Sequence, residues 1–144
     1  MTVATNAEVF ALHRYFIWAD RMRVHFRDSL LREPPGTDDK QVARDAHTYP
    51  YMAYWYGGMH VVIEGWRELQ LTDLEIDGLL DSPHVELLRR YRNGAFHFQR
   101  QYFDERFTGF WGEGDDGAKW IHRLRETFSR WFLDRLAQER KDRT

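Results

Sequence analysis

Apolar residues recur at intervals of three and four along most of this chain. The first such series is Leu12, Phe16, Ala19, Met22, Phe26 and Leu30. An α-helix completes a turn in about 3.6 residues, so this spacing places the apolar side chains on one face of a helix. No stretch of the sequence shows the sustained alternation of apolar and polar residues that is typical of strands. The sequence therefore predicts an all-α fold.

Capping and helix-breaking residues locate the ends of the predicted helices. Residues 5–8, Thr-Asn-Ala-Glu, form a capping-box pattern that begins the first helix, and the Pro-Pro-Gly sequence at 34–36 ends it. A second helical region spans 38–69, with a break near Pro50, because proline lacks an amide hydrogen and disfavours helix at the preceding residue. Its predicted buried stripe is Met52, Trp55, Met59, Val62 or Ile63, and Trp66.

The second half of the chain continues this pattern. A capping box at 72–75 opens a short helix, and Ser82-Pro83 begins a longer helix that is predicted to continue to Tyr102. Residues 105–111 are expected to form another short helix. The residues predicted to be buried are Leu88, Tyr91, Ala95, Phe98 and Tyr102 in the longer helix, and Ile121, Leu124, Phe128, Trp131 or Phe132, and Leu136 in the last one.

These helices predict a single domain, residues 1–144, folded as an up-and-down bundle of four main helices plus one or two short ones. A chain of 144 residues with 42% hydrophobic residues can bury one core. It contains no cysteine, which excludes disulfides and thiolate metal sites. We expect the polar tail, residues 138–144, to fray.

Charge and hydropathy restrict the partners. The first residues lack the basic and apolar regions of a signal peptide, and no apolar run approaches the roughly 20 residues that span a bilayer. We therefore expect a soluble, cytoplasmic protein with no membrane partner. The net charge of −2 argues against a general nucleic-acid coat protein. Residues 73–86 carry five acids and no Lys or Arg, however, whereas residues 87–103 carry four arginines and no acid.

The arginine-rich segment contains residues suited to RNA cleavage. Imidazole can accept or donate the proton of a ribose 2′-hydroxyl near neutral pH, which makes His97 the candidate general base and acid. Arg92 offers planar donors to a phosphate, and Asn93 can orient the imidazole or bind a phosphate oxygen. Further candidates for phosphate contact are Arg89, Arg90 and Arg100. The attacking hydroxyl belongs to RNA itself, so we expect no metal and no other cofactor.

A helical wheel separates the two main candidates. On a regular helix Asn93 and His97 share the face opposite the core, whereas Arg92 lies about 140° from His97. Gly94 costs about 1 kcal/mol of helix stability relative to alanine and is best tolerated where another helix or subunit approaches closely. We therefore expect either a distortion at Asn93-Gly94 or a site composed across a homodimer. A dimer formed through this helix is the favoured prediction.

A second group of polar residues lies on the helix expected after Pro50. Tyr56, His60 and Glu64 are each four residues apart and therefore share one flank. They form either a structural hydrogen-bonded ladder, which is the more common role, or a wall of the active site with Glu64 facing the arginine motif.

Residues 92–97, Arg-Asn-Gly-Ala-Phe-His, resemble the R-x4-6-H signature of HEPN domains in its four-spacer form, with the polar residue that many members carry directly after the arginine. HEPN domains are all-α bundles, often dimeric, and many are metal-independent ribonucleases of toxin–antitoxin, phage-defence and CRISPR systems. The resemblance implies catalytic roles for Arg92 and His97, support from Asn93, and an antitoxin protein as a further partner. Some HEPN toxins carry a tyrosine two residues after the histidine that a partner enzyme modifies. This chain has Gln99 there, so that mode of control is not expected.

Three other functions remain open. A HEPN-like module could bind RNA or a nucleotide without cutting it, or it could serve only in protein interaction, with its arginines on a solvated face. A metal enzyme could instead use ligands on facing helices, although no HExxH or ExxH pair is present. The ligands of such a site would be His47, His60, Glu64 and His97.

Overall fold

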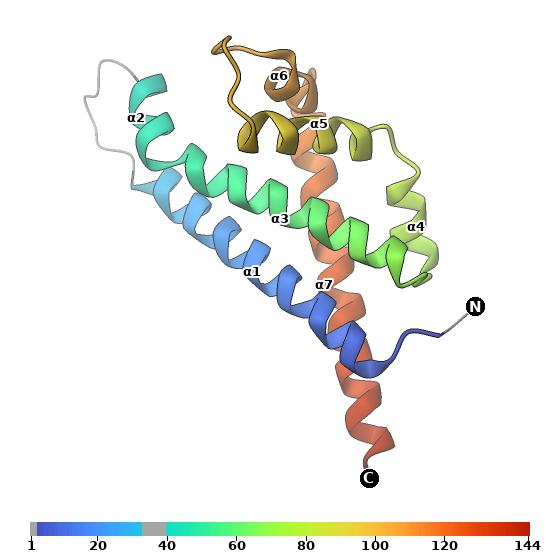
Figure 1. Ribbon diagram of the computed structural model, residues 1–144. Helices are drawn as coiled ribbons and strands as arrows, with labels where there is room; N and C mark the ends of the chain where they lie inside the picture. Colours follow the sequence, from blue (N-terminus) through green and yellow to red (C-terminus); the bar gives the residue numbers. More distant parts are fainter. Residues whose placement is uncertain (1–2, 33–39) are drawn as a thin grey trace.

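The computed structural model describes residues 3–32 and 40–144, which form an α-helical bundle (Figure 1). The helices in this part of the chain are α1 (Asn6–Leu31), α2 (Lys40–His47), α3 (Tyr49–Glu68), α4 (Leu74–Leu80), α5 (His84–Phe96), α6 (Glu105–Trp111) and α7 (Asp116–Asp142). The all-α prediction is confirmed, with four longer helices as expected and three short ones rather than one or two. Among the described residues, no helix combines the length and the apolar character needed to cross a bilayer.

The α1 and α3 helices lie side by side in opposite directions (Figure 1). Their close approach depends on glycine, because a Cβ atom at Gly58 would lie only 2.8 Å from Cβ of Ala19. The predicted capping box begins α1: the Thr5 hydroxyl accepts from the Glu8 amide, and the Glu8 carboxylate accepts from the Thr5 amide. Of the predicted apolar stripe, the buried or partly buried members are Leu12, Phe16, Ala19, Met22 and Phe26.

The ends of these two helices correct one prediction and confirm another. Leu30, predicted to point inward, is 38% exposed, because it lies in the last turn of α1, where α3 has not yet begun. The neighbouring Ser29 hydroxyl lies 2.8 Å from that of buried Thr48, the residue between α2 and α3. The predicted break before Pro50 is therefore confirmed, and the whole predicted stripe of α3 is buried. The Pro-Pro-Gly terminator at 34–36 lies outside the described residues.

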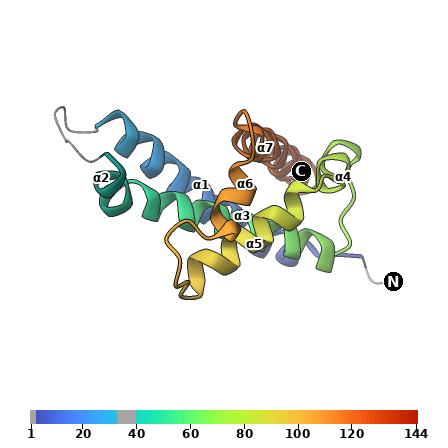
Figure 2. The ribbon, with the colours of Figure 1, turned by 90° about the horizontal axis from the view of Figure 1, so that it is seen from above.

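The long α7 helix crosses the α1–α3 pair and closes the core (Figures 1 and 2). Phe132 packs against Phe16, with ring centroids 5.4 Å apart, and Phe128 packs edge-on against Trp66 at 5.5 Å. Ile121 and Leu124 are fully buried, as predicted, whereas Trp131 and Leu136 are only partly buried. The segment predicted to fray is helical as far as Asp142.

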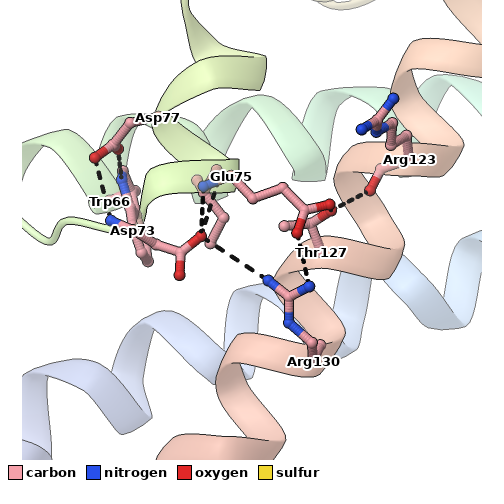
Figure 3. A network of polar contacts seen from close by, with 8 residues as sticks. Trp66, Asp73, Glu75, Asp77, Arg123, Thr127 and Arg130 are labelled. Atoms are coloured by element: carbon pink, nitrogen blue, oxygen red, sulfur yellow. Dashed lines mark hydrogen bonds and ion pairs between the residues drawn. The ribbon is translucent and has the colours of Figure 1, made fainter.

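A polar network joins α4 to α7 (Figure 3). Asp73 caps α4, since its carboxylate accepts from the amides of Glu75 and Ile76; the predicted capping box led by Thr72 is therefore wrong by one residue. Glu75 in turn pairs with Arg130 of α7 at 2.7 Å. The indole of Trp66 donates to Asp77 at 3.0 Å and fixes α4 to the end of α3.

The α5 and α6 helices pack on the side of α3 that faces away from α1 (Figures 1 and 2). Ser82 accepts from the His84 amide, so α5 begins close to its predicted start. It ends at Phe96, and the predicted continuation to Tyr102 is wrong. Phe98 and Tyr102, expected in the core, are 92% and 59% exposed, because residues 97–104 form an irregular connector that leads to α6.

Candidate functional site

Arg92 is held against α3 by its stem and by its charge. A Cβ atom at Gly57 would lie 3.7 Å from Cγ of Arg92, an ordinary contact distance, so the arginine stem lies on the α3 backbone at this glycine. Nη1 of Arg92 lies 3.6 Å from Oε1 of Glu64, and Nη2 donates to Oδ1 of Asn93 at 3.2 Å. The side chain keeps 35% exposure, while its buried Nε makes no hydrogen bond with a described residue.

His60 and Glu64 form the wall that faces this arginine. Nδ1 of His60 lies 2.7 Å from Oε1 of Glu64, and the imidazole is nearly buried. Burial lowers the pKa of His60 below its ordinary value, and the positive charge of Arg92 lowers it further, against the opposing effect of Glu64. The structure thus contains features of both predicted alternatives: His60 and Glu64 form a ladder contact along α3, and Glu64 also faces Arg92.

Tyr56 does not join this polar wall. Its side chain is 4% exposed, and its ring lies 5.1 Å from the rings of both Tyr91 and Phe110. Burial raises the pKa of the Tyr56 hydroxyl well above its ordinary range. Tyr56 is therefore a core residue that helps to seat α5 and α6 on α3.

His97 is the first residue after α5 and has extended backbone angles, φ −127° and ψ 128°. Its amide donates to the Asn93 carbonyl at 3.0 Å and closes the last turn of the helix. Its imidazole is exposed and makes no hydrogen bond, ion pair or ring contact with any described residue. The helical face predicted for Asn93 and His97 is thus wrong, because the chain leaves the helix before His97.

Because α5 ends at Phe96, the arginines predicted to share one helical face do not all lie on the helix. Arg89 and Arg90 lie on α5, where Arg89 donates to Glu86 at 2.9 Å and Arg90 is exposed. Arg100, predicted to share their face, is exposed on the connector instead. In the described part of the chain, no hydrogen bond or ion pair joins Arg92 to His97. The phosphate-binding candidates are therefore distributed around the end of α5 rather than along one face.

Gly94 explains how α6 reaches this end of α5. A Cβ atom at Gly94 would lie 2.9 Å from Cβ of Arg106 and 3.2 Å from the Phe107 ring. Another helix does approach at Gly94, as predicted, and that helix is α6 of the same chain. The helix continues through Asn93 and Gly94, and its end lies two residues beyond them rather than at the predicted distortion.

A cavity of about 460 Å³ opens beside His97. It lies between the start of α3, the end of α5, the connector and α6, and Asp45 of α2 also reaches it. Its aromatic lining residues are Tyr49, Tyr91, Phe98, Tyr102, Phe103, Phe107 and Trp111. Sequence reasoning missed this cavity because it placed Phe98 and Tyr102 in the core. The dense aromatic residues directly after the motif were the available signal.

Hydrogen bonds order the connector that forms one wall of the cavity. Nε2 of Gln99 donates to the His97 carbonyl at 2.8 Å, and Oε1 of Gln99 accepts from Nη1 of Arg106 at 2.9 Å. Arg106 also pairs with Asp104, the N-cap of α6, at 3.2 Å. Gln99 therefore couples the backbone of His97 to α6.

The ligand set considered for a metal is not assembled. The described residues contain no group of three or more His, Cys, Asp or Glu side chains placed to hold a metal ion, so His47 and His97 do not join His60 and Glu64. Comparison of this chain with protein-family models, with curated proteins and with solved structures found no match.

Proposed function

We propose that this protein is a metal-independent endoribonuclease of HEPN type. One observation carries the proposal: the imidazole of His97 is exposed and has no partner among the described residues, directly after a helix whose last turns present Arg92 and Asn93. A histidine that serves only structure is normally packed or hydrogen-bonded, as His60 is in this protein.

In this mechanism His97 acts on the ribose 2′-hydroxyl. As general base it removes the hydroxyl proton, and the oxygen attacks the adjacent phosphorus; an imidazolium then returns a proton to the departing 5′-oxygen. Since RNA supplies its own nucleophile, the reaction yields a 2′,3′-cyclic phosphate and needs no activated water. DNA, which lacks this hydroxyl, is not a substrate.

Arg92 and Asn93 hold the phosphate. A guanidinium carries five N–H donors, and among the described residues only the bond to Asn93 and the longer contact with Glu64 engage those of Arg92. The remaining donors can bind two phosphate oxygens and offset the charge that develops in the transition state. Exposed Arg90 and Arg100 add sequence-independent attraction for the neighbouring phosphates.

Among the described residues no hydrogen bond joins Arg92 to His97, and this separation favours a site that is composed of two chains. In a two-fold homodimer that pairs the ends of α5, Arg92 of one protomer can meet His97 of the other, and the symmetry creates two such sites. The resemblance to HEPN ribonucleases supports this arrangement, and it extends the proposal to a cytoplasmic toxin or defence role with an antitoxin protein as partner.

The test is cleavage of a single-stranded RNA in the presence of a chelator. Purified protein is expected to release products that end in a 2′,3′-cyclic phosphate, whereas the same oligonucleotide with 2′-O-methyl groups stays intact. Loss of activity in both His97→Ala and Arg92→Ala, with unchanged helical content, supports the proposal. His25→Ala, which alters an exposed histidine on α1, is the matched control. Wild-type protein that cuts no RNA of varied sequence rejects it.

A non-catalytic RNA- or nucleotide-binding module is the second candidate. The same separation of Arg92 and His97 favours it if the protein is a monomer, because each residue then contacts a phosphate or a base independently. Tight binding of RNA by a monomer that never cleaves it would decide for this function.

A further inference from the structure

The cavity beside His97 differs in chemistry from the arginines around it. Its lining contains seven aromatic residues and one acid, Asp45, but no Lys or Arg among the described residues. A phosphate group would therefore find no arginine or lysine from the described residues inside it. A flat, uncharged ligand with polar edges suits it better, since aromatic rings can cover the faces while Gln101 and Thr108 offer hydrogen bonds at the margins.

The connector presents further aromatic surface at the mouth of this cavity. Phe98 is 92% exposed and Phe103 is 68% exposed, although both belong to the cavity lining. Large apolar side chains left open beside a cavity contribute little to the stability of the chain. Exposed aromatic rings next to arginines are instead the usual components of surfaces that stack unpaired nucleobases.

We infer that this cavity binds a nucleobase of single-stranded RNA, an inference that rests on the proposed ribonuclease function. The base enters between the connector and α6, with its ribose and phosphate outside. Because His97 lies on the cavity lining, it stands next to the sugar of the bound nucleotide. The volume of about 460 Å³ lies within the range of small-molecule sites, about 300–1,000 Å³.

The inference also defines the substrate class. A base in a duplex is stacked on both faces and paired along its edge, so it cannot enter a cavity of this kind without being extruded. The protein should therefore act on loops, ends and unstructured strands rather than on double-stranded RNA.

The experiment measures binding of a short 2′-O-methyl oligoribonucleotide, which has no free 2′-hydroxyl and is not cut. Fluorescence anisotropy compares the single strand with the same strand annealed to its complement. We expect the duplex to bind at least about tenfold more weakly, and Phe103→Ala to weaken single-strand binding by about 5- to 100-fold, the range for loss of one stacked base. Tyr54→Ala removes a 59% exposed aromatic ring from α3, outside the cavity lining, and should leave single-strand binding unchanged.

A second variant alters the cavity from α6, so that its effect on binding does not depend on the conformation of the connector. Thr108→Phe adds volume on the α6 wall at an exposed position, so it should fill the cavity, preserve the fold and weaken single-strand binding. Equal binding of single strand and duplex, or binding unaffected by Phe103→Ala and Thr108→Phe, overturns the inference. Such results beside normal RNA cleavage leave the ribonuclease function standing, whereas cavity-dependent binding without any cleavage keeps the cavity assignment and rejects catalysis.

Discussion

Arg92 and His97 lie five residues apart in one motif, yet their surroundings differ in every respect. Arg92 lies within α5, with its stem on Gly57, its guanidinium near Glu64 and a hydrogen bond to Asn93. His97 follows the helix, and its imidazole has no partner among the described residues. The arginine is held within one chain, whereas the imidazole of His97 is held by no described residue. Under the function that we propose, a substrate or a second copy of the chain would position the histidine.

This difference suits the two roles that we propose. Electrostatic stabilisation is effective when the donors are already oriented, because reorganisation during the reaction would cost free energy. A general base must reach a proton on the substrate, and catalytic hydrogen bonds often form only in the complex. A fixed arginine and an exposed histidine should therefore respond differently to substitution.

The largest expected effect is on catalysis by His97→Ala. General acid–base catalysis contributes about 10²- to 10⁴-fold, and the RNA cleavage rate should fall by that amount. Because the imidazole makes no hydrogen bond, ion pair or ring contact with the described residues, the free energy of unfolding should stay unchanged. Urea titrations and single-turnover rates measure the two quantities. A loss of stability that accompanies the loss of activity would show that His97 is a structural residue.

Arg92→Lys should have the next largest effect. Lysine keeps the positive charge but loses the planar fork of donors, so the cleavage rate should fall by roughly 10²-fold, as for removal of an oriented donor. Unlike His97→Ala, this change should also cost up to about 1 kcal/mol of stability, because the partly exposed contacts with Asn93 and Glu64 weaken. Arg21→Lys on the exposed surface of α1 is the control for a neutral exchange. Wild-type rates in Arg92→Lys would mean that only charge is needed.

A pair of glycine substitutions tests how the end of α5 is fixed. Gly78→Ala in α4 meets no atom within 4 Å and should stabilise the protein by up to about 1 kcal/mol, the gain in helix propensity. The same change at Gly94 places Cβ 2.9 Å from Arg106, so it should instead destabilise the protein by about 1–3 kcal/mol. Thermal unfolding of both variants measures these two changes in stability, which should have opposite signs. Stabilisation by Gly94→Ala would show that α6 is not held tightly against α5.

The smallest expected effect concerns the pH dependence set by His60. Its pKa is lowered in the folded state, so below about pH 6.5 the unfolded chain binds a proton more readily and the folded state loses stability as the pH falls. His60→Gln removes this contribution, and its stability should decline less between pH 7 and pH 5. Burial also lowers the pKa of His13 and His122. Both residues are present in the wild type and in His60→Gln, so their contributions to the pH dependence cancel in the comparison. If the stability of His60→Gln and of the wild type fell equally with pH, the imidazole of His60 would lie in solvent rather than in the core.

The contrast between Arg92 and His97 also marks the limit of what the sequence could predict. Helix periodicity correctly gave the all-α fold, the stripe of α3 and the short α6, since burial of an apolar stripe determines these elements. It failed beyond Phe96, because Phe98 and Tyr102 continue the spacing of three and four although their rings border a cavity. Apolar spacing alone cannot distinguish a ring that packs in the core from one that is left open for a ligand.

The facing of Glu64 toward Arg92 was one of two predicted arrangements, and choosing between them required tertiary structure. The sequence also does not show which glycines allow two helices to approach closely. Gly57 and Gly94 matter through the atoms they meet in other helices, Phe96 and Arg106, and those contacts depend on how the helices cross.

Mixing two inactive variants tests the composite site most directly. Arg92→Ala and His97→Ala protomers are combined in equal amounts after exchange, and RNA cleavage is measured against each variant alone. Half of the dimers are then mixed, and each has one site with both residues intact, so the account predicts recovery of about a quarter of the wild-type activity. A mixture as inactive as its two components would contradict the account.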